Sequence, residues 1–276
     1  MTIRQISLTD FRNLHSTTLD LHNNLNIITG LNASGKTSFL EALHIICKGS
    51  SFKTHLLNHC IQHNKQSFLL FSKFEAYKAG ISRSSTSKTI IRINNETIHK
   101  VSSLAKKTPV KIINSSCFDL ILGSPSLRRD YMDFCLFHVE HSYLTLFTEY
   151  AHALKQRNAL LKSRSNLSEL DYWDAFLAVR CNAISKYRIE IIQMINHILS
   201  SYFSESFLNN PVEIIYQPGW NTELMFLDVL KKNRSRDIKY GFTRYGVHRD
   251  ELKYISNGFD IQRIFSRGQI KKTSIF

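Results

Sequence analysis

The chain has 276 residues, 43% hydrophobic and 21% charged, so it is long enough and apolar enough to fold around a substantial core. Its 36 lysines and arginines exceed its 22 acidic residues, and the net charge of +14 predicts a polyanionic partner, because binding to phosphates releases counterions. The chain lacks a signal-peptide pattern, a membrane-length apolar run and any C-x-x-C pair, which predicts a cytoplasmic protein with no membrane partner.

The N-terminal third reads as strands around one helix. Apolar patterning predicts strands over residues 3–8 and 17–21, and a third strand over residues 25–29 that enters a glycine-containing loop. After this loop, apolar residues at helical spacing predict a helix over residues 38–48, with Gly49 as its stop. Downstream, we expect antiparallel strands over residues 68–75 and 88–94, a turn at Asn94-Asn95 and a short buried strand over residues 110–113.

The character of the chain changes near Pro125. Between about residue 126 and residue 208 there is almost no glycine or proline, and long stretches such as 143–162 and 171–203 are predicted to be helical. Strand-like segments then return, with a turn at Asn257-Gly258, over residues 212–216, 238–244, 252–255 and 259–261. The pattern predicts an α/β domain interrupted by a helical insertion.

A phosphate-binding motif follows the third predicted strand. The pattern G-x-x-x-x-G-K-[ST] is matched at each fixed position by Gly30, Leu31, Asn32, Ala33, Ser34, Gly35, Lys36 and Thr37. The glycines let the backbone turn tightly enough to aim N–H groups at one phosphate. Lys36 is expected to reach the β- and γ-phosphates, and the Thr37 hydroxyl to hold Mg²⁺. Because a strand is predicted before the loop and a helix after it, we predict that this loop binds ATP with Mg²⁺.

A second motif lies near the C-terminus, where Ser266-Arg267-Gly268-Gln269 follows Phe265. By itself this S-x-G-Q match indicates no more than a turn. Together with the phosphate loop it resembles the signature loop of ABC-type ATPases, which contacts the γ-phosphate of ATP held by a second subunit. This resemblance implies that Ser266, Gly268 and Gln269 bind nucleotide in an ATP-dependent, head-to-tail homodimer.

Segments along the whole chain, in the same order, resemble the RecF family of bacterial recombination and gap-repair proteins, a branch of the SMC-like ABC ATPases. They are residues 8–13 (L-T-D-F-R-N), 35–42 (G-K-T-S-F-L-E-A), 123–133 with the G-S-P, R-R and D positions, 154–161 (L-K-Q-R-N-A-L-L) and 246–250 (G-V-H-R-D). The resemblance implies an ABC-type P-loop ATPase head with an inserted helical lobe. Its expected parts are residues 1–122 of the head, the lobe over residues 123–210, and a return to the head over residues 211–276.

The same resemblance implies an ATP-gated DNA clamp for recombinational gap repair and replication restart after DNA damage, within the SOS response. Its expected partners are duplex DNA, single-strand/duplex junctions and other recombination mediator proteins. Basic residues expected to contact DNA phosphates are Arg128, Arg129, Lys155, Arg157, Lys231, Lys232, Arg234 and Arg236. A basic surface without a partner is the alternative reading of the charge.

Three departures from the family pattern bear on activity. Ala33 stands in the loop where the family has glycine, Val247 replaces a proline, and Ser115-Ser116 stands where related proteins carry a Pro-acid pair of the Mg²⁺-sensing loop. The chain ends at Phe276, seven residues after Gln269, before the segment in which the fold carries its Walker B acids.

Substitutes for the Walker B acids are weak, since Asp228 and the Asp250-Glu251 pair are expected to be ordinary helix or loop acids. The sequence therefore indicates a C-terminally truncated form of a weak DNA-dependent ATPase, which binds ATP without hydrolysing it efficiently. The alternatives are an inactive remnant of that protein and a P-loop enzyme of another class, a kinase or a GTPase, although the GTPase motif N-K-x-D does not occur.

Overall fold

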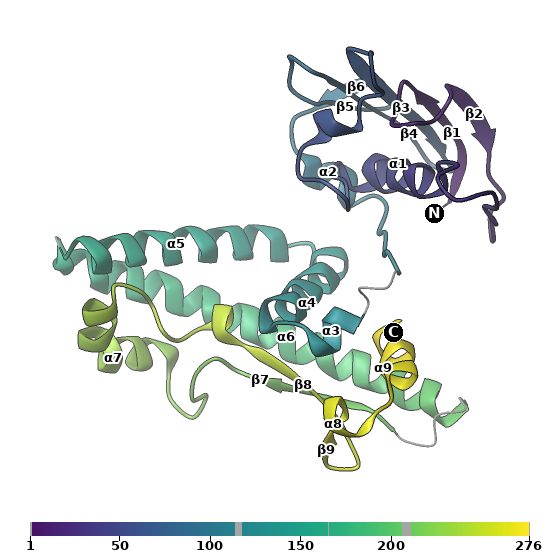
Figure 1. The fold of residues 1–276 in the computed structure, drawn as a ribbon. Coiled ribbons are helices and arrows are strands. Elements are labelled where there is room, and N and C mark those ends of the chain that lie inside the picture. The colour runs from purple at the N-terminus through teal and green to yellow at the C-terminus, as the bar shows by residue number, and fades with distance from the viewer. Residues whose placement is uncertain (1, 114–117, 165, 206–210, 276) are drawn as a thin grey trace. The chain divides into compact units, whose positions relative to one another are not determined.

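The computed structural model describes residues 2–113, 118–164, 166–205 and 211–275. The chain forms two compact units, Met1–Ile112 and Ile113–Phe276, which we call the first and second unit and describe one at a time (Figure 1). The Ser115-Ser116 pair, singled out above for the Mg²⁺-sensing loop, lies outside the described residues. The three-part division at residues 122/123 and 210/211 stays a prediction.

The first unit is an antiparallel sheet with a helix against one face. Strand order is β2-β1-β3-β4-β5-β6. Because alternate residues of a strand point to opposite faces, β3 buries Phe68, Leu70 and Phe74 on the face covered by helix α1. The strands are β1 (Ile3–Thr9), β2 (Thr17–Asp20), β3 (Ser67–Phe74), β4 (Lys78–Ser84), β5 (Ile90–Ile93) and β6 (Glu96–Ile98), and the helices are α1 (Lys36–Lys48), α2 (Val101–Ala105) and the 3₁₀ turn η1 (Leu57–Cys60).

Helix α1 forms as the sequence predicts. Ala42, Ile45 and Ile46 form its buried stripe against the sheet. Gly49 ends the helix in the left-handed conformation, with φ 68°, and its N–H donates to the Ile45 carbonyl oxygen. The helix therefore ends at a defined residue and packs against the sheet through one face.

Three predicted strands are wrong among the described residues. Residues 25–29 form no strand, and Leu25 and Ile27 are 69% and 78% exposed, because no described strand pairs with this apolar segment. Residues 110–113 likewise have no pairing strand. Residues 238–244 alternate like a strand, but helix α7 (Phe226–Tyr240) runs into this stretch and ends at Gly241. Conversely, β4 was not predicted, because its small residues have low strand propensity. It forms a strand because it pairs with β3 on one side and β5 on the other.

The second unit combines long helices with a three-stranded antiparallel sheet of order β7-β8-β9 (Figure 1). Helices α5 and α6 pack against each other, and α6 also packs on β7. The long helices confirm the helical stretches predicted from residue 126 onward. The elements are α3 (Asp119–Leu122), α4 (Pro125–Val139), α5 (Tyr143–Ser163), η3 (Leu167–Glu169), α6 (Leu170–Glu205), β7 (Glu213–Gln217), α7, η4 (Val247–Arg249), β8 (Glu251–Ser256), β9 (Phe259–Asp260), α8 (Ile261–Ile264) and α9 (Arg267–Ile275).

One hydrophobic core holds the second unit together. Leu177 and Ile184 of α6 are fully buried in it, and so are residues of the later segments, such as Leu230 of α7 and Ile261 of α8. The segments after residue 210 thus share their core with the helical lobe. This arrangement fixes the α7–β8 region, which carries the family motif of residues 246–250, on the helices α5 and α6.

Candidate nucleotide-binding site

The phosphate loop adopts a tight, partly left-handed path before α1. Gly30 and Gly35 have φ values of 147° and 96°. The left-handed backbone at Gly35 strains any residue with a side chain, and a Cβ there would also lie 2.3 Å from Leu14 Cδ2, so glycine is favoured at this position. Ala33 also adopts a positive φ, 66°, at a cost of about 1–2 kcal/mol for an L-residue. The turns bring the loop to the start of α1, whose first N–H groups lack helical partners and can donate to a phosphate.

The Lys36 ammonium lies over this loop. Its Nζ donates to the carbonyl oxygens of Gly30 and Leu31, at 2.8 and 2.7 Å. These contacts hold a cation at the N-terminus of α1. The lysine charge and the helix dipole would therefore both attract an anion to this place. Thr37, in the first turn of α1, is exposed on the same loop. Lys36 and Thr37 therefore both lie at the turn from the loop into α1.

Asn13 ties the loop to the helix, a role that the sequence analysis did not assign. Its Nδ2 donates to the Ala33 carbonyl oxygen at 3.1 Å, and its Oδ1 accepts from the Ser38 hydroxyl at 2.9 Å. The Asn13 side chain thus connects Ala33 in the loop to Ser38 in the first turn of α1. The only sequence signal was the L-T-D-F-R-N segment, which was noted for its family resemblance.

A polar cleft of about 310 Å³ opens at the start of α1. Two lysines, two asparagines and two hydroxyl residues line it, and this donor set fits a polyphosphate. The exposed Thr37 hydroxyl is an oxygen ligand of the kind that Mg²⁺ takes beside nucleotide phosphates. No cluster of three His, Cys, Asp or Glu able to hold a metal occurs in the described parts of the chain. The cleft is lined by Asn13, Asn32, Ala33, Gly35, Lys36, Thr37, Ser38 and Lys53.

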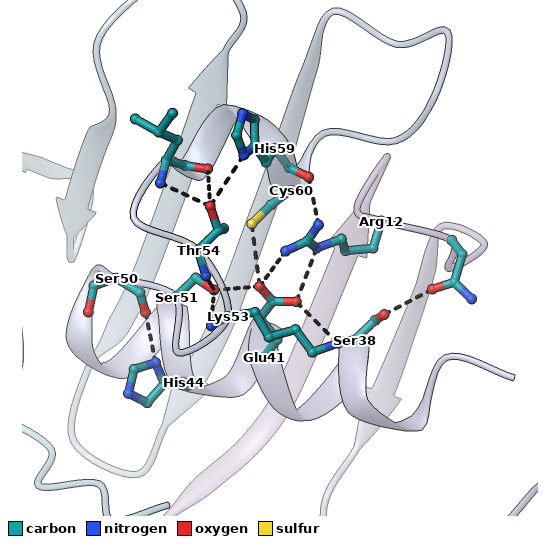
Figure 2. A network of polar contacts seen from close by, with 12 residues as sticks. Arg12, Ser38, Glu41, His44, Ser50, Ser51, Lys53, Thr54, His59 and Cys60 are labelled. Atoms are coloured by element: carbon teal, nitrogen blue, oxygen red, sulfur yellow. Dashed lines mark hydrogen bonds and ion pairs between the residues drawn. The ribbon is translucent and has the colours of Figure 1, made fainter. Parts of the chain in front are cut away.

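A buried carboxylate lies at the centre of a polar network beside this cleft, as Figure 2 shows. Glu41 of α1 is fully buried and accepts two hydrogen bonds from the Arg12 guanidinium, at 2.7 and 3.1 Å. The Ser51 hydroxyl donates to it at 2.5 Å and the Cys60 thiol at 3.6 Å. The Lys53 ammonium lies 4.0 Å from the same carboxylate. Glu41 thereby joins the segments before β2 and after α1, and its charge lies beside the exposed Lys53 ammonium.

The electrostatics of this network keep Glu41 ionised. Burial acts to raise the Glu41 pKa, but the hydrogen bonds from Arg12 and Ser51 outweigh it, so the pKa lies below its ordinary value. The hydrogen bond to Glu41 is the main reason why the Arg12 pKa is raised. Burial raises the Cys60 pKa to about 12, so this thiol is an inert structural group. Glu41 lies in the segment 35–42 quoted for its family resemblance, but the sequence assigned no role to Glu41 or Lys53, because their roles depend on contacts between distant segments.

The signature-like loop lies in the second unit, at the start of α9. The Ser266 N–H donates to Gln269 Oε1 at 2.8 Å, and the Gln269 N–H donates to Ser266 Oγ at 3.4 Å. This reciprocal pair is a capping box, which satisfies two N–H groups at a helix start. The next N–H groups of α9, on Arg267 and Gly268, lack helical partners by position. Ser266 and Gly268 are exposed.

The acids considered as Walker B substitutes have structural partners or lie on a helix. Asp250 is fully buried and pairs with Arg188 at 2.6 Å. Glu251 accepts from Arg128 at 2.6 and 3.1 Å. Asp228 lies in the first turn of α7, where the helix dipole stabilises a negative charge. These contacts account for the acids without a catalytic role.

Several arginines predicted to contact DNA are internal instead. The Arg157 side chain is fully buried and pairs with Asp174 and Asp237, at 2.5 and 2.8 Å. Arg128 is buried and pairs with the partly exposed Glu251, so the prediction of a phosphate contact is wrong for Arg128 and Arg157. Arg234 pairs with Asp174 and with a second carboxylate of α6. The exposed cations that remain from the predicted set are Lys155, Lys231, Lys232 and Arg236.

Comparisons with known proteins agree with this architecture. The family model of the AAA ATPase domain matches residues 1–217. The DNA replication and repair protein RecF of Pseudoalteromonas translucida is 34% identical over 98% of this chain and 76% of that protein. RecF of Cellvibrio japonicus is also 34% identical, with the same shares covered. No helix in the described ranges combines the length and apolar character of a membrane span.

Solved structures show the same fold. The structure of the recombination mediator protein RecF with ATP, in the RecFOR pathway, has a TM-score of 0.87 and 25% identity, and covers 99% of this chain and 78% of that one. An SMC head bound to the C-winged helix domain of ScpA has a TM-score of 0.57 at 13% identity, over 100% of this chain and 74% of that one. The predicted fold class, an ABC-type P-loop ATPase head with an inserted helical lobe, is confirmed.

Proposed function

This chain belongs to the RecF family of DNA replication and repair proteins, and we propose that it uses ATP, bound with Mg²⁺ at residues 30–37, to assemble on DNA. The family membership supports an ATP-binding recombination mediator. The observation that carries the proposal is the loop geometry, in which Lys36 and the unpaired N–H groups of α1 converge on one polar cleft. Thr37 would hold Mg²⁺, which supplies charge neutralisation between phosphates when bound.

The second part of the proposal is an ATP-dependent homodimer. Ser266, Gly268 and Gln269 at the start of α9 would contact the γ-phosphate of nucleotide held by the other copy. The support is a helix start that presents free N–H groups beside an exposed hydroxyl, which is a suitable site for a phosphate. ATP would then join two copies, because each nucleotide would contact the phosphate loop of one copy and the α9 start of the other.

The third part is the cellular role. We infer a DNA clamp in the cytoplasm, opened and closed by nucleotide, that acts in recombinational gap repair and replication restart and in the SOS response to DNA damage. It would hold duplex DNA and single-strand/duplex junctions, together with other recombination mediators. The net charge of +14 supports a polyanionic partner, and binding through phosphates would make it steeply dependent on salt.

Calorimetric titration with ATP and Mg²⁺ tests the nucleotide site. Lys36→Ala removes the cation but leaves the backbone turns, so affinity should fall by about 1.5–3 kcal/mol, or roughly 10- to 150-fold. Lys88→Ala removes an exposed lysine of the same unit and serves as the matched control, with an expected change below about twofold. Equal affinities of the wild type and Lys36→Ala would overturn the site.

Molar mass from light scattering during gel filtration tests the dimer. Ser266→Asp keeps an acceptor for the Gln269 N–H, so α9 stays capped, but it brings a negative charge to the proposed γ-phosphate contact. We expect the wild type to dimerise with ATP and Ser266→Asp to stay monomeric, while both bind ATP alike as monomers. A dimer of Ser266→Asp, or an ATP-independent wild-type dimer, would contradict the sandwich arrangement.

A further inference from the structure

Exposed aromatic rings and cations gather where α7 ends in the second unit. Tyr240 is 57% exposed and Phe242 is 40% exposed, although rings of this size are ordinarily buried. Lys239, Arg244 and Arg249 accompany them, and we call these five residues the Tyr240 cluster. Of these residues only Arg249 lies in a quoted motif, that of residues 246–250. The cluster itself was not predicted, since its members come from the end of a helix and from the segment that follows it.

The cations of the Tyr240 cluster lie against its rings. Arg244 Cζ is 5.3 Å from the Tyr240 ring centroid, and Arg249 Cζ is 5.6 Å from that of Phe242. Lys239 Nζ is 6.0 Å from the Tyr240 centroid. These distances are those of cation–π contacts. The two ring centroids are 6.3 Å apart, with planes inclined by 49°, so the rings form one small platform held beside positive charge.

The segment that carries the platform is anchored by hydrogen bonds from Thr243 to buried and partly buried neighbours. Thr243, between the ring residues and the arginine, is buried, and its N–H donates to Asn158 Oδ1 at 2.7 Å. Its hydroxyl accepts from Arg157 at 2.8 Å, and its carbonyl oxygen bonds to His248 Nε2 at 3.0 Å. Because these contacts fix the backbone, the exposed rings do not lose much further freedom when a ligand stacks on them.

The surroundings of the platform are basic. Lys232, Arg236 and Tyr240 follow one another at four-residue spacing on α7, so they lie on one helix face, and the two cations are exposed. Lys162, also exposed, lies with its Cα 3.7 Å from a Cβ built at Gly241. The acid in this turn of α7, Asp237, is buried and paired with Arg157. A polyanion can therefore approach the platform along a path of positive charge.

We propose that the Tyr240 cluster binds single-stranded nucleic acid, with unpaired bases stacked on Tyr240 and Phe242 and with the phosphates beside Arg244 and Arg249. Stacking on aromatic rings combined with a basic track is how proteins hold unpaired strands. The bases of a duplex are already stacked on each other and leave mainly phosphates to contact, so the rings would add little to duplex binding. The inference rests on the proposed function, because it names one strand-binding surface of a DNA-binding protein.

The test compares two probes on the full chain by fluorescence anisotropy, a thymidine oligonucleotide and a blunt duplex of the same length. Tyr240→Ala should weaken binding of the oligonucleotide by about 5- to 100-fold and binding of the duplex by less than about twofold. Tyr240→Trp should restore single-strand binding. Phe259→Ala removes an aromatic side chain that is 65% exposed outside the cluster, and it should leave both affinities unchanged.

Salt dependence separates stacking from charge. Tyr240→Ala should leave the slope of log affinity against log salt unchanged, whereas Arg244→Gln should lower the single-strand slope by about 0.7 for the lost phosphate contact. Photocrosslinking of an iodouracil-substituted oligonucleotide should label Tyr240 or Phe242, and this readout does not require a variant to fold.

The outcomes distinguish the inference from the function on which it rests. Salt-dependent duplex binding with no effect of Tyr240→Ala on the oligonucleotide, and with crosslinks elsewhere, would overturn the inference and leave the proposed function standing. Equal losses for both probes would also overturn it. If the wild type binds neither probe but retains an acidic polypeptide such as polyglutamate, both the proposed DNA role and this inference fail.

Discussion

The sharpest prediction concerns His248 in the family motif of residues 246–250. The ring is largely enclosed, with Nδ1 2.7 Å from the Tyr150 hydroxyl and Nε2 3.0 Å from the Thr243 carbonyl oxygen. Because a carbonyl oxygen only accepts, Nε2 carries the proton and Nδ1 accepts from Tyr150. The ring is thus satisfied in its neutral form. Burial, reinforced by the charge of Arg249, lowers the His248 pKa to about 4.

The sign and size of the effect on stability follow from this pKa. The unfolded chain takes up a proton as the pH falls through 6.5, whereas folded His248 stays neutral until about pH 4. The free energy of unfolding is therefore highest above pH 6.5 and falls as the pH is lowered through this window. Lowering the His248 pKa from 6.5 to about 4 contributes about 3 kcal/mol to the free energy of unfolding at high pH, and about 2 kcal/mol of this is lost by about pH 5.

Urea unfolding followed by tryptophan fluorescence measures this loss. Both tryptophans of the chain, Trp173 and Trp220, lie in the second unit, so the signal reports the unit that contains His248. Between about pH 7.5 and about pH 5 the wild type should lose about 2 kcal/mol, because most carboxylates titrate below this range. His248→Asn, which cannot titrate, should lose much less over the same interval. Equal losses in both proteins would refute the neutral, buried histidine.

Two further predictions concern the buried network and the DNA surface. Glu41→Gln removes the carboxylate at the centre of the network, so it should destabilise the first unit by about 3 kcal/mol in thermal unfolding. Glu75→Gln, at an exposed ion pair, is the control and should cost under about 1 kcal/mol. Similar losses for the two variants would contradict a special role for the buried pair. The double change Lys231→Glu and Lys232→Glu should weaken duplex DNA binding equally for all sequences and make the affinity less dependent on salt, as measured by fluorescence anisotropy. A loss confined to some sequences would count against recognition through phosphates.

The features that could be predicted from the sequence are those set by neighbouring residues. The phosphate motif encodes its own turn and the helix after it, and Gly49 ends that helix because glycine accepts a left-handed conformation. The turn at Asn94-Asn95 joins β5 to β6, with φ of 49° and 73°, and Asn257-Gly258 joins β8 to β9 in the same way. Each of these depends on local backbone preference alone.

Features that depend on distant partners could not be predicted in this way. Residues 25–29 have the composition of a buried strand, but a strand exists only when another strand supplies its hydrogen bonds. Glu41 looks like an ordinary helix residue, and its burial is intelligible only once Arg12 and Ser51 are seen to meet it. The Tyr240 cluster likewise depends on where a helix ends and on what anchors the following turn.

The basic character of the surface is a further case in which the total charge and the single residue say different things. Of the residues whose burial is described, the buried charged ones are three arginines and four carboxylates, namely Arg128, Arg157, Arg188, Glu41, Asp174, Asp237 and Asp250. Since more acids than bases are hidden, the basic excess left outside is at least that of the whole chain. An approaching polyanion would meet that excess, so the total charge bears on such a partner without naming the residues that contact it. An arginine in the sequence, by contrast, is as able to neutralise a carboxylate inside the protein as a phosphate outside it.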